Sequence, residues 1–254
     1  MIFRNRGLIA LSVLLSTAMW LAAQTPNEQN TPSHWKRKPD VENVHYGPYE
    51  RNVLDLYLAK SDTPTPLVMY FHGGAWVVGN KYLVELPLLD FCKKGGVTVA
   101  GVNYRYSTES PYPGPFRDCA RAVQFLRLHA REYNINPAAV AATGGSAGAD
   151  MSLWPGFRPD MSDPKSDDPV ERQSTRLSAV GVTNAQTYID RRELRKLVGE
   201  KGANNGAFPK LFGMRPDEMD SERAYRLYEE ASAHSNASKN AAPVFMFYSG
   251  DNKQ

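Results

Sequence analysis

Cysteine and net charge are both scarce in this sequence. The 254 residues include two cysteines, Cys92 and Cys119, which excludes a disulfide-bonded scaffold. Neither has another Cys or a His nearby at the spacing of a metal site, so structural zinc is not expected. The 30 Lys and Arg residues exceed the 27 Asp and Glu residues by only three, and no basic block is interleaved with aromatic residues. This charge is too small to attract nucleic acid by releasing counterions, so we expect no nucleic-acid partner.

Long apolar runs are also absent. The run over residues 8–21 is shorter than the roughly 20 residues that cross a bilayer. It follows Arg4 and Arg6 and leads to the small pair Ala22-Ala23. This order of a charged start, an apolar centre and a small-residue cleavage point is typical of a secretory signal. We therefore predict a signal peptide over residues 1–23, export to the periplasm or the medium, and no stable membrane span after cleavage.

The rest of the chain contains enough apolar surface for one folded domain. Residues 24–40 are rich in Pro, Asn, Gln and Thr, so we expect a flexible lead-in there. The chain as a whole is 42% apolar and 22% charged, which is typical of a soluble domain with a sizeable core. No internal repeat and no linker interrupts residues 41–254, which we predict to form a single domain.

Short apolar runs alternate with helical patterns along this domain. Such alternation predicts an α/β fold, with a mostly parallel sheet and helices on both of its faces. Strands are expected over residues 41–46, 52–58, 67–71, 97–102, 140–143, 177–182 and 244–248. The clearest helix is expected over residues 116–133, where apolar residues recur at every third or fourth position. Other helices are expected over residues 82–94, 146–154, 189–198 and 221–232.

The strongest chemical motif is Gly-x-Ser-x-Gly at residues 144–148, between an expected strand and an expected helix. The glycines on either side allow the sharp bend that holds Ser146 above the sheet. The helix beginning at Ala147 directs its N–H groups and its positive end toward the same point, which favours a developing oxyanion. The pattern predicts a nucleophilic serine; a glycine-rich turn with an incidental serine is the alternative.

A second motif, His72-Gly73-Gly74, directly follows the expected strand over residues 67–71. Its glycines let backbone N–H groups approach a substrate oxygen closely, which is how a second oxyanion donor is supplied. We expect His72 to position this loop rather than to transfer protons, because it precedes the nucleophile at a strand end. A simple turn beside a buried Trp76 is the alternative.

These two motifs resemble those of the α/β-hydrolase family, specifically the HGG-type esterases related to hormone-sensitive lipase and the bacterial feruloyl-esterase-like BD-FAE group. The resemblance covers roughly residues 53–251. It implies an α/β-hydrolase fold and the hydrolysis of acetyl or feruloyl carbohydrate esters, or of small esters, through an acyl-enzyme and without a cofactor. It also implies Ser146 as nucleophile, with the Gly73, Gly74 and Ala147 N–H groups as oxyanion donors.

The resemblance extends to the sequence Asn103-Tyr104-Arg105-Tyr106 and to Asp118. Arg105 and Asp118 are expected to form a structural ion pair that joins a strand end to a helix start. Two irregular stretches, residues 154–175 with four prolines and residues 199–217, are expected to form a rim or lid beside Ser146. Plain surface loops are the alternative.

The sequence departs from the family pattern near its C-terminus. In the family the triad follows the order Ser, acid, His, with the His after one further strand. The five histidines, all of which precede the expected acid, are His34, His45, His72, His129 and His234. We therefore expect the fold to lack its last strand and helix, and the 254-residue chain to have little activity for want of a catalytic histidine. The alternatives are a catalytically inactive hydrolase-fold binding protein and a substitute base at His234.

Two carboxylates are candidates for the catalytic acid. Asp251 follows the expected strand over residues 244–248, although Lys253 occupies the position where the family usually has its acid. Asp190 follows the preceding strand, where some hydrolases place the acid. Asp150, one helical turn beyond Ser146, is expected to cap the helix or to pair locally.

Overall fold

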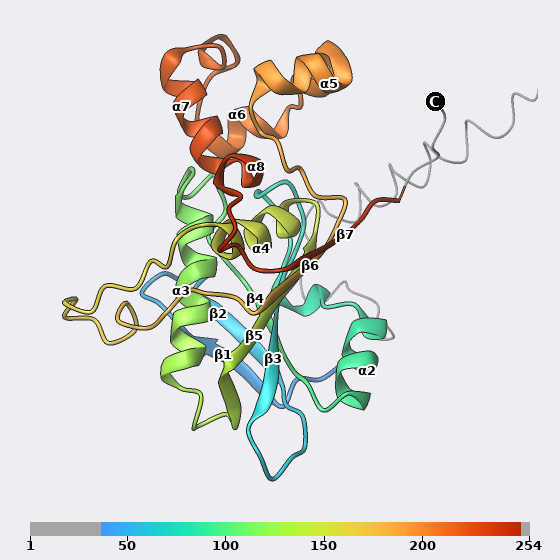
Figure 1. Cartoon of the computed structure of the whole chain (residues 1–254), viewed down its shortest axis with the longest axis vertical. Coiled ribbons are helices and arrows are strands. Elements are labelled where there is room, and N and C mark those ends of the chain that lie inside the picture. The colour runs from blue at the N-terminus through green and yellow to red at the C-terminus, as the bar shows by residue number, and fades with distance from the viewer. Residues whose placement is uncertain (1–36, 250–254) are drawn as a thin grey trace, which may run out of the picture.

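The computed structural model describes residues 37–249. The strands are β1 (Val41–His45), β2 (Val53–Tyr57), β3 (Thr65–Phe71), β4 (Thr98–Val102), β5 (Ile135–Gly145), β6 (Ala179–Thr183) and β7 (Val244–Phe247). They form one sheet in the order β1-β2-β4-β3-β5-β6-β7 (Figure 1). β2 is antiparallel to both neighbours, whereas the strands from β4 to β7 are parallel. The predicted strands and the mostly parallel sheet are confirmed, whereas the signal peptide and Asp251 lie outside the described residues.

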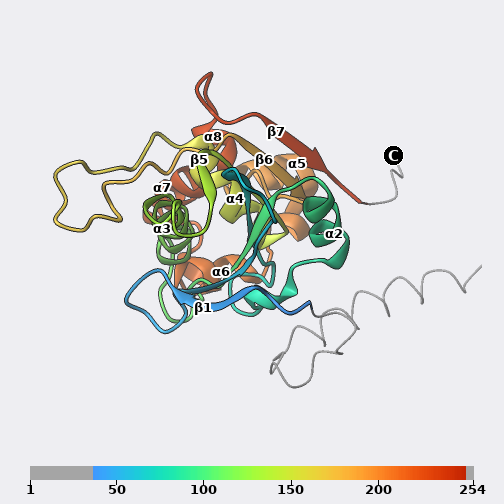
Figure 2. The same cartoon turned by 90° about the horizontal axis from the view of Figure 1, so that it is seen from below.

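Helices lie on both faces of this sheet (Figure 2). On one face lie α3 (Gly114–Leu128) and α4 (Ala147–Phe157), and on the other lies α2 (Leu86–Lys94). Met69 and Tyr70 show why both faces need cover, because neighbouring residues of a strand point to opposite sides. Met69 belongs to the large apolar cluster with α3 and α4, and Tyr70 to a smaller cluster with α2. Cys119 lies in the first cluster and Cys92 in the second, both as free thiols.

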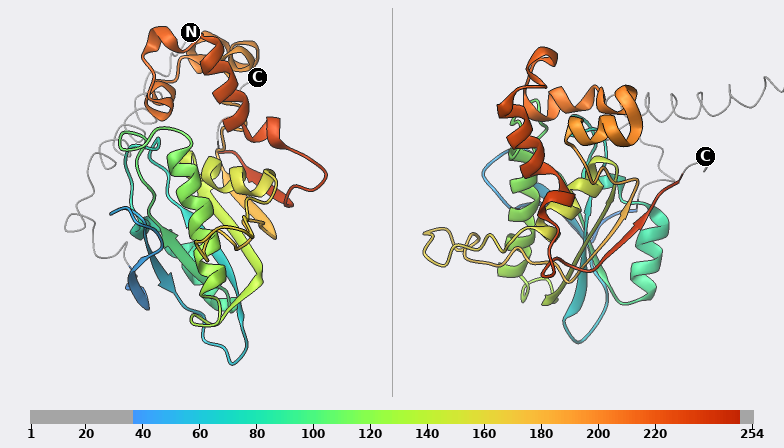
Figure 3. Two further views of the ribbon diagram at one scale, coloured as in Figure 1. Left: turned by 90° about the vertical axis from the view of Figure 1, so that its left-hand side faces the viewer. Right: turned by 45° about the horizontal axis from the view of Figure 1, so that its top comes forward.

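The remaining helices gather beyond the carboxyl ends of the parallel strands (Figures 1 and 3). They are α5 (Arg191–Ala203), α6 (Ala207–Phe212), α7 (Glu222–Ala231) and α8 (Ala233–Asn236). We call this group, residues 191–236, the cap. α6 and α8 occupy stretches where no helix is expected from the sequence, because each is too short for its apolar residues to show a helical period. None of the helices within residues 37–249 has the length and apolar character needed to cross a membrane.

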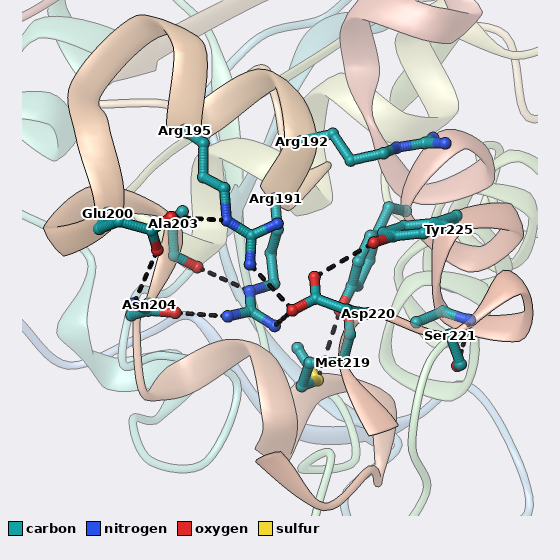
Figure 4. Close-up of polar contacts among 12 residues, drawn as sticks. Arg191, Arg192, Arg195, Glu200, Ala203, Asn204, Met219, Asp220, Ser221 and Tyr225 are labelled. Carbon is teal, nitrogen blue, oxygen red and sulfur yellow. Dashed lines mark hydrogen bonds and ion pairs between the residues drawn. The ribbon is translucent and has the colours of Figure 1, made fainter. Parts of the chain in front are cut away.

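Polar contacts centred on Asp220 join the parts of the cap (Figure 4). Asp220 Oδ2 accepts a hydrogen bond from Arg195 Nη2 at 2.9 Å and lies 3.2 Å from Arg191 Nη1. Arg191 Nε donates to the Ala203 carbonyl at 3.1 Å. Tyr225 Oη lies 3.3 Å from Asp220 Oδ1. The Asp220 carboxylate therefore holds the first half of α5 to the chain around the start of α7, and Arg191 in turn holds the end of α5.

Several boundaries and one location differ from the sequence-based expectation. β5 begins at Ile135 rather than at residue 140, α2 begins at Leu86 rather than at residue 82, and α5 ends at Ala203 rather than at residue 198. Pro155 does not end α4, which continues to Phe157, because every residue of this helix is buried and its packing outweighs one missing backbone hydrogen bond. α3 ends at Leu128 rather than at residue 133.

The loop over residues 158–178 runs from the end of α4 to the start of β6 (Figure 1). Its first residue, Arg158, donates to the Glu230 carbonyl of α7 at 3.1 Å, and beyond it the loop lies beside α3, where Gln124 donates to the Gln173 carbonyl at 2.8 Å. Most of the loop thus packs along α3 rather than over Ser146, which favours the alternative expectation of a plain surface loop.

Candidate active site

Ser146 forms the turn between β5 and α4. Its backbone has φ 53° and ψ −124°, a conformation that is strained for any residue with a side chain. Its N–H donates to the carbonyl of Thr183 at 3.1 Å, which fixes the turn to the end of β6. The side chain is exposed. The turn thus presents the Ser146 hydroxyl at the carboxyl edge of the sheet, as the motif predicts.

Two glycines let this turn pack against the end of β3. A Cβ atom at Gly144 would lie 2.4 Å from the Phe71 carbonyl oxygen, and one at Gly148 would lie 2.0 Å from the same atom. Neither glycine has a positive φ. Their role is therefore close approach between β3 and the nucleophile turn, rather than the freedom to bend that the sequence suggests.

The loop after β3 lies directly beside the nucleophile. A Cβ atom at Gly73 would lie 3.8 Å from Ser146 Cβ and 3.0 Å from the Gly145 carbonyl oxygen. Gly74 has φ +115°, which only glycine adopts without strain. Within residues 37–249 the Gly73 and Gly74 N–H groups have no hydrogen-bond acceptor. Ala147 is the first residue of α4, so its N–H has no acceptor inside that helix. The predicted oxyanion donors therefore belong to the two segments that meet at Ser146.

His72 supports this loop from inside the protein. Its side chain is fully buried, its ring stacks on Tyr104 at 4.3 Å between centroids, and Nδ1 lies 2.8 Å from the Gly73 carbonyl oxygen. Burial lowers the pKa of His72 to about 3, so the ring is neutral at pH 7. Because a carbonyl only accepts hydrogen bonds, the proton is assigned to Nδ1. A neutral ring held this way fits the positioning role expected from the sequence.

The far end of the same loop is braced by residues near the ends of β2 and β4. The Gly79 carbonyl accepts hydrogen bonds from Tyr106 Oη at 2.6 Å and from Arg51 Nη2 at 3.2 Å. The Arg51 guanidinium lies over the Tyr106 ring, 3.6 Å from its centroid. Arg105 and Asp118 form the expected ion pair, with Nη2 and Oδ1 2.7 Å apart. The residues that carry the family resemblance after β4 therefore fix the loop and the start of α3.

The two candidate acids occupy different situations. Asp190 caps the start of α5, accepting the Arg192 N–H at 2.9 Å and pairing with its guanidinium at 2.5 Å. Burial acts to raise the pKa of Asp190, but the hydrogen bonds from Arg192 outweigh it and hold the pKa below its usual range. Asp251 lies outside the described residues, but Ser249 donates its N–H to Asn184 Oδ1 at 2.9 Å. The chain that leads to Asp251 is thus attached to the end of β6, and both candidates stay predictions.

None of the histidine rings within residues 37–249 is hydrogen-bonded to Ser146, although the backbone of His72 lies next to the nucleophile turn. His234 is exposed on α8, with its ring stacked on Tyr188 at 4.3 Å between centroids. His129 pairs with Glu132 at 2.8 Å beyond the end of α3. Across residues 37–249, no group of three or more His, Cys, Asp or Glu side chains is arranged to hold a metal ion.

The cap borders this site through the loop after β3. Phe208 on α6 contacts Trp76, with ring centroids 6.4 Å apart. The Leu211 carbonyl of α6 accepts the Tyr112 N–H at 2.8 Å, which ties the cap to the segment before α3. The stretch over residues 199–217 thus lies at the carboxyl ends of the strands, where a rim is expected.

A long-range contact of Asp150 was not anticipated from the sequence. Asp150 neither caps α4 nor pairs locally; Oδ1 accepts the backbone N–H of Gln186, in the segment after β6, at 3.1 Å. The side chain is 3% exposed. Nothing in the local sequence signals this partner, because the two residues come together only when α4 packs against the end of β6.

Comparison with known proteins identifies the family of this chain. The family model of BD-FAE matches residues 54–254. The chain belongs to the BD-FAE family. The resemblance drawn from the two motifs is therefore confirmed, and the match takes in both the Gly-Gly loop and the nucleophile turn.

The chain matches only part of the length of individual relatives. It is 33% identical over 140 residues to the "probable carboxylic ester hydrolase" LipM of Mycobacterium tuberculosis, covering 54% of this chain and 32% of LipM. It is 28% identical over 109 residues to an esterase of Gibberella moniliformis, covering 42% of this chain and 34% of that protein. The chain thus spans about a third of the length of these curated relatives.

Solved structures confirm the fold of this BD-FAE member. A truncated carbohydrate esterase from gut microbiota superposes with a TM-score of 0.69 at 22% identity, covering 87% of this chain and 81% of that one. An acetyl ester-xyloside bifunctional hydrolase from Caldicellulosiruptor lactoaceticus gives a TM-score of 0.65 at 24% identity, covering 82% and 74%. The prediction of an α/β-hydrolase fold is confirmed.

Proposed function

We propose that this chain carries the catalytic centre of an exported serine carboxylesterase. The single observation behind the proposal is the strained turn that presents Ser146 beside two segments with free N–H groups. The esterases among its relatives support the reaction class. The carbohydrate esterase and the acetyl ester-xyloside hydrolase among its structural neighbours support acetyl or feruloyl carbohydrate esters, or small esters, as the substrate class.

In the proposed reaction Ser146 Oγ attacks the ester carbonyl carbon and the alcohol leaves, which forms an acyl-enzyme that water then hydrolyses. The Gly73, Gly74 and Ala147 N–H groups stabilise the negative charge that develops on the carbonyl oxygen. In a complete triad a histidine, oriented by Asp251 or Asp190, would take the proton of Ser146 and return it to the departing alcohol, and then take a proton from the attacking water. No cofactor takes part.

We further propose that the 254-residue chain turns over slowly, since no histidine ring of residues 37–249 is hydrogen-bonded to Ser146. Without a base, the oxyanion donors and binding alone supply about 10³- to 10⁴-fold acceleration over water. The same observation supports the second candidate, a hydrolase-fold protein that binds esters without cleaving them. Saturable binding of an acetylated xylo-oligosaccharide with no Ser146-dependent turnover would favour that candidate.

Replacing the nucleophile tests the proposal most directly. Where the triad is complete, Ser146→Ala should lower kcat by about 10⁶-fold, the scale of losing a triad serine. In the slow 254-residue chain the same substitution should change kcat little, because triad residues act as a unit. Ser235→Ala, at an exposed position of α8, is the matched control and should leave kcat unchanged. A fluorophosphonate should label Ser146 alone, as read by peptide mapping. Label on another residue, or none on an enzyme that hydrolyses p-nitrophenyl acetate, would refute the assignment.

Export is a separate part of the proposal. The charged, apolar and small-residue segments of residues 1–23 support it. Expression with the native N-terminus should give a mature protein that begins near Gln24 outside the cytoplasm. An uncleaved, cytoplasmic product would contradict export without affecting the catalytic proposal.

A further inference from the structure

Two buried oxygen atoms, one on the nucleophile helix α4 and one on Gln186, have no hydrogen-bond donor within residues 37–249. Asp150 lies in the first turn of α4, and its Oδ1 accepts the Gln186 N–H at 3.1 Å. Its other oxygen, Oδ2, is shielded from solvent and has no hydrogen-bond partner within residues 37–249. The side-chain oxygen of Gln186, Oε1, is also shielded and lacks a partner in that range. Leaving two acceptors buried and unsatisfied is costly. Because the Oδ1 bond already joins Asp150 to Gln186, one donor between the two side chains would satisfy both oxygens.

A proton on Asp150 supplies that donor. An ionised carboxylate only accepts hydrogen bonds, whereas a protonated one has an O–H that donates. Burial raises the pKa of Asp150 well above its usual range, and the hydrogen bond from the Gln186 N–H offsets this only in part. Neither β5 nor β6 contains an ionisable residue. The ionisable groups on the other elements around α4 include Tyr70, Asp118, Cys119, Tyr188, Asp190 and His234, and none of them shifts the pKa of Asp150.

The segment that Asp150 holds, residues 184–190, joins three parts of the molecule. The Asn184 N–H donates to the Phe247 carbonyl of β7 at 2.8 Å. The Ile189 N–H donates to Ser232 Oγ at 3.0 Å, at the junction of α7 and α8. The segment ends at Asp190, and Asn184 holds the chain that leads to Asp251. Residues 184–190 therefore help to hold the catalytic acid in place, whether that acid is Asp190 or Asp251.

We propose that Asp150 is a positioning residue. It is held as the neutral acid and donates its O–H to Gln186 Oε1. This bond fixes residues 184–190, and the candidate acids attached to them, on the helix that begins beside Ser146. The catalytic part of this inference rests on the proposed esterase function, whereas the neutral carboxyl and its bond to Gln186 do not.

The pH dependence of stability tests the neutral state. A carboxyl whose pKa is higher in the folded than in the unfolded chain loses stability as pH rises from about 3.9 to its folded value. Asp150→Asn keeps the shape and a donor but cannot ionise. The Tm of this variant minus that of the wild type should therefore increase as pH is raised from 4 to 9. A difference that stays flat or decreases over this range would overturn the proposal.

Hydrogen exchange tests what the bond holds. Asp150→Leu, which removes both polar atoms and keeps the branch at Cγ, should speed amide exchange of peptide 184–190 at least tenfold and leave peptide 72–80 unchanged. Asp150→Asn should exchange like the wild type. Exchange in the Asn variant as fast as in the Leu variant would mean that an ionised carboxylate is needed, with the Gln186 amide turned to donate, and the proposal would fall. If the Leu variant does not fold, the exchange rates of the Asn variant and the wild type still decide whether a neutral donor at residue 150 is enough to hold residues 184–190.

Turnover tests the positioning role. In an active enzyme Asp150→Leu should lower kcat for p-nitrophenyl acetate with KM nearly unchanged, and Asp150→Asn should restore kcat at pH 7. Equal loss in both variants would contradict the role of the neutral acid. Fluorophosphonate labelling of a residue other than Ser146 would refute the proposed function instead, and the melting and exchange measurements would still decide the state of Asp150.

Discussion

Two segments flank Ser146, and they are fixed in different ways. The loop over residues 72–80, after β3, is held by side chains near the ends of neighbouring strands: Arg51, Tyr104 and Tyr106. The segment over residues 184–190, after β6, is held by α4, β7 and the cap. The hydrogen bonds of the first segment therefore come from residues near strand ends, with one ring contact to the cap between Trp76 and Phe208, whereas the second segment depends on elements that must first assemble around it.

Each segment is also supported by a buried ionisable group in its neutral form. The two groups become charged on opposite sides of neutral pH. His72 behind the first segment has a pKa of about 3, and Asp150 behind the second has a pKa raised by burial. Acid therefore weakens the support of the oxyanion loop, and alkali weakens the support of residues 184–190. The two sides of the nucleophile can be perturbed separately.

Among the substitutions that distinguish the two segments, replacing Gly73 or Gly74 of the first segment should lower catalytic efficiency most. Gly74→Ala places a Cβ 2.1 Å from the Val78 carbonyl oxygen at φ +115°, so the loop must change shape. Gly73→Ala places one 3.0 Å from the Gly145 carbonyl oxygen, beside the nucleophile. Each should lower kcat/KM on p-nitrophenyl acetate by about 10²- to 10³-fold, the cost of a lost oxyanion donor.

Gly181→Ala in β6 is the matched control, because a Cβ there meets no atom within 4 Å. It should keep kcat/KM near that of the wild type. If Gly74→Ala, folded by circular dichroism, also kept its activity, the loop would be a plain turn with no part in catalysis.

Removing the buried histidine should give a smaller, pH-dependent effect. Because the folded pKa of about 3 lies below the unfolded value, the wild type loses stability as pH falls through the range below 6.5. The loss is about 1.4 kcal/mol per pH unit for one such group. Between pH 7 and pH 5 the wild type should therefore lose about 2 kcal/mol more than His72→Asn, as measured by urea unfolding.

His45→Asn, at an exposed position of β1, is the control and should follow the wild-type pH dependence. Equal acid sensitivity of His72→Asn and the wild type would show that the ring takes up its proton at the same pH in the folded and the unfolded chain, and the contrast between the two segments would disappear.

The same contrast explains what could be predicted from the sequence. The loop over residues 72–80 and the turn at Ser146 were predictable, because closely spaced glycines next to an apolar strand signal them locally. The bond between Asp150 and Gln186 spans 36 residues of sequence and leaves no local pattern. The loop over residues 158–178 is irregular as predicted, but its prolines do not reveal at which end of the sheet it lies.

The smallest expected effect concerns the cap. Asp220→Asn removes the charge that Arg191 and Arg195 share, next to the end of residues 184–190. The Asp220 side chain is 45% exposed, so the loss of stability should be only about 1 kcal/mol or less. Because Arg191 directly follows the second segment, amide exchange of peptide 184–190 should become faster, whereas peptide 72–80 should not change. Asp217→Asn, whose partner Arg215 is 74% exposed, is the control and should change neither peptide. Faster exchange in both peptides after Asp220→Asn would mean that the cap supports both sides of Ser146, and that the sheet alone does not hold the oxyanion loop.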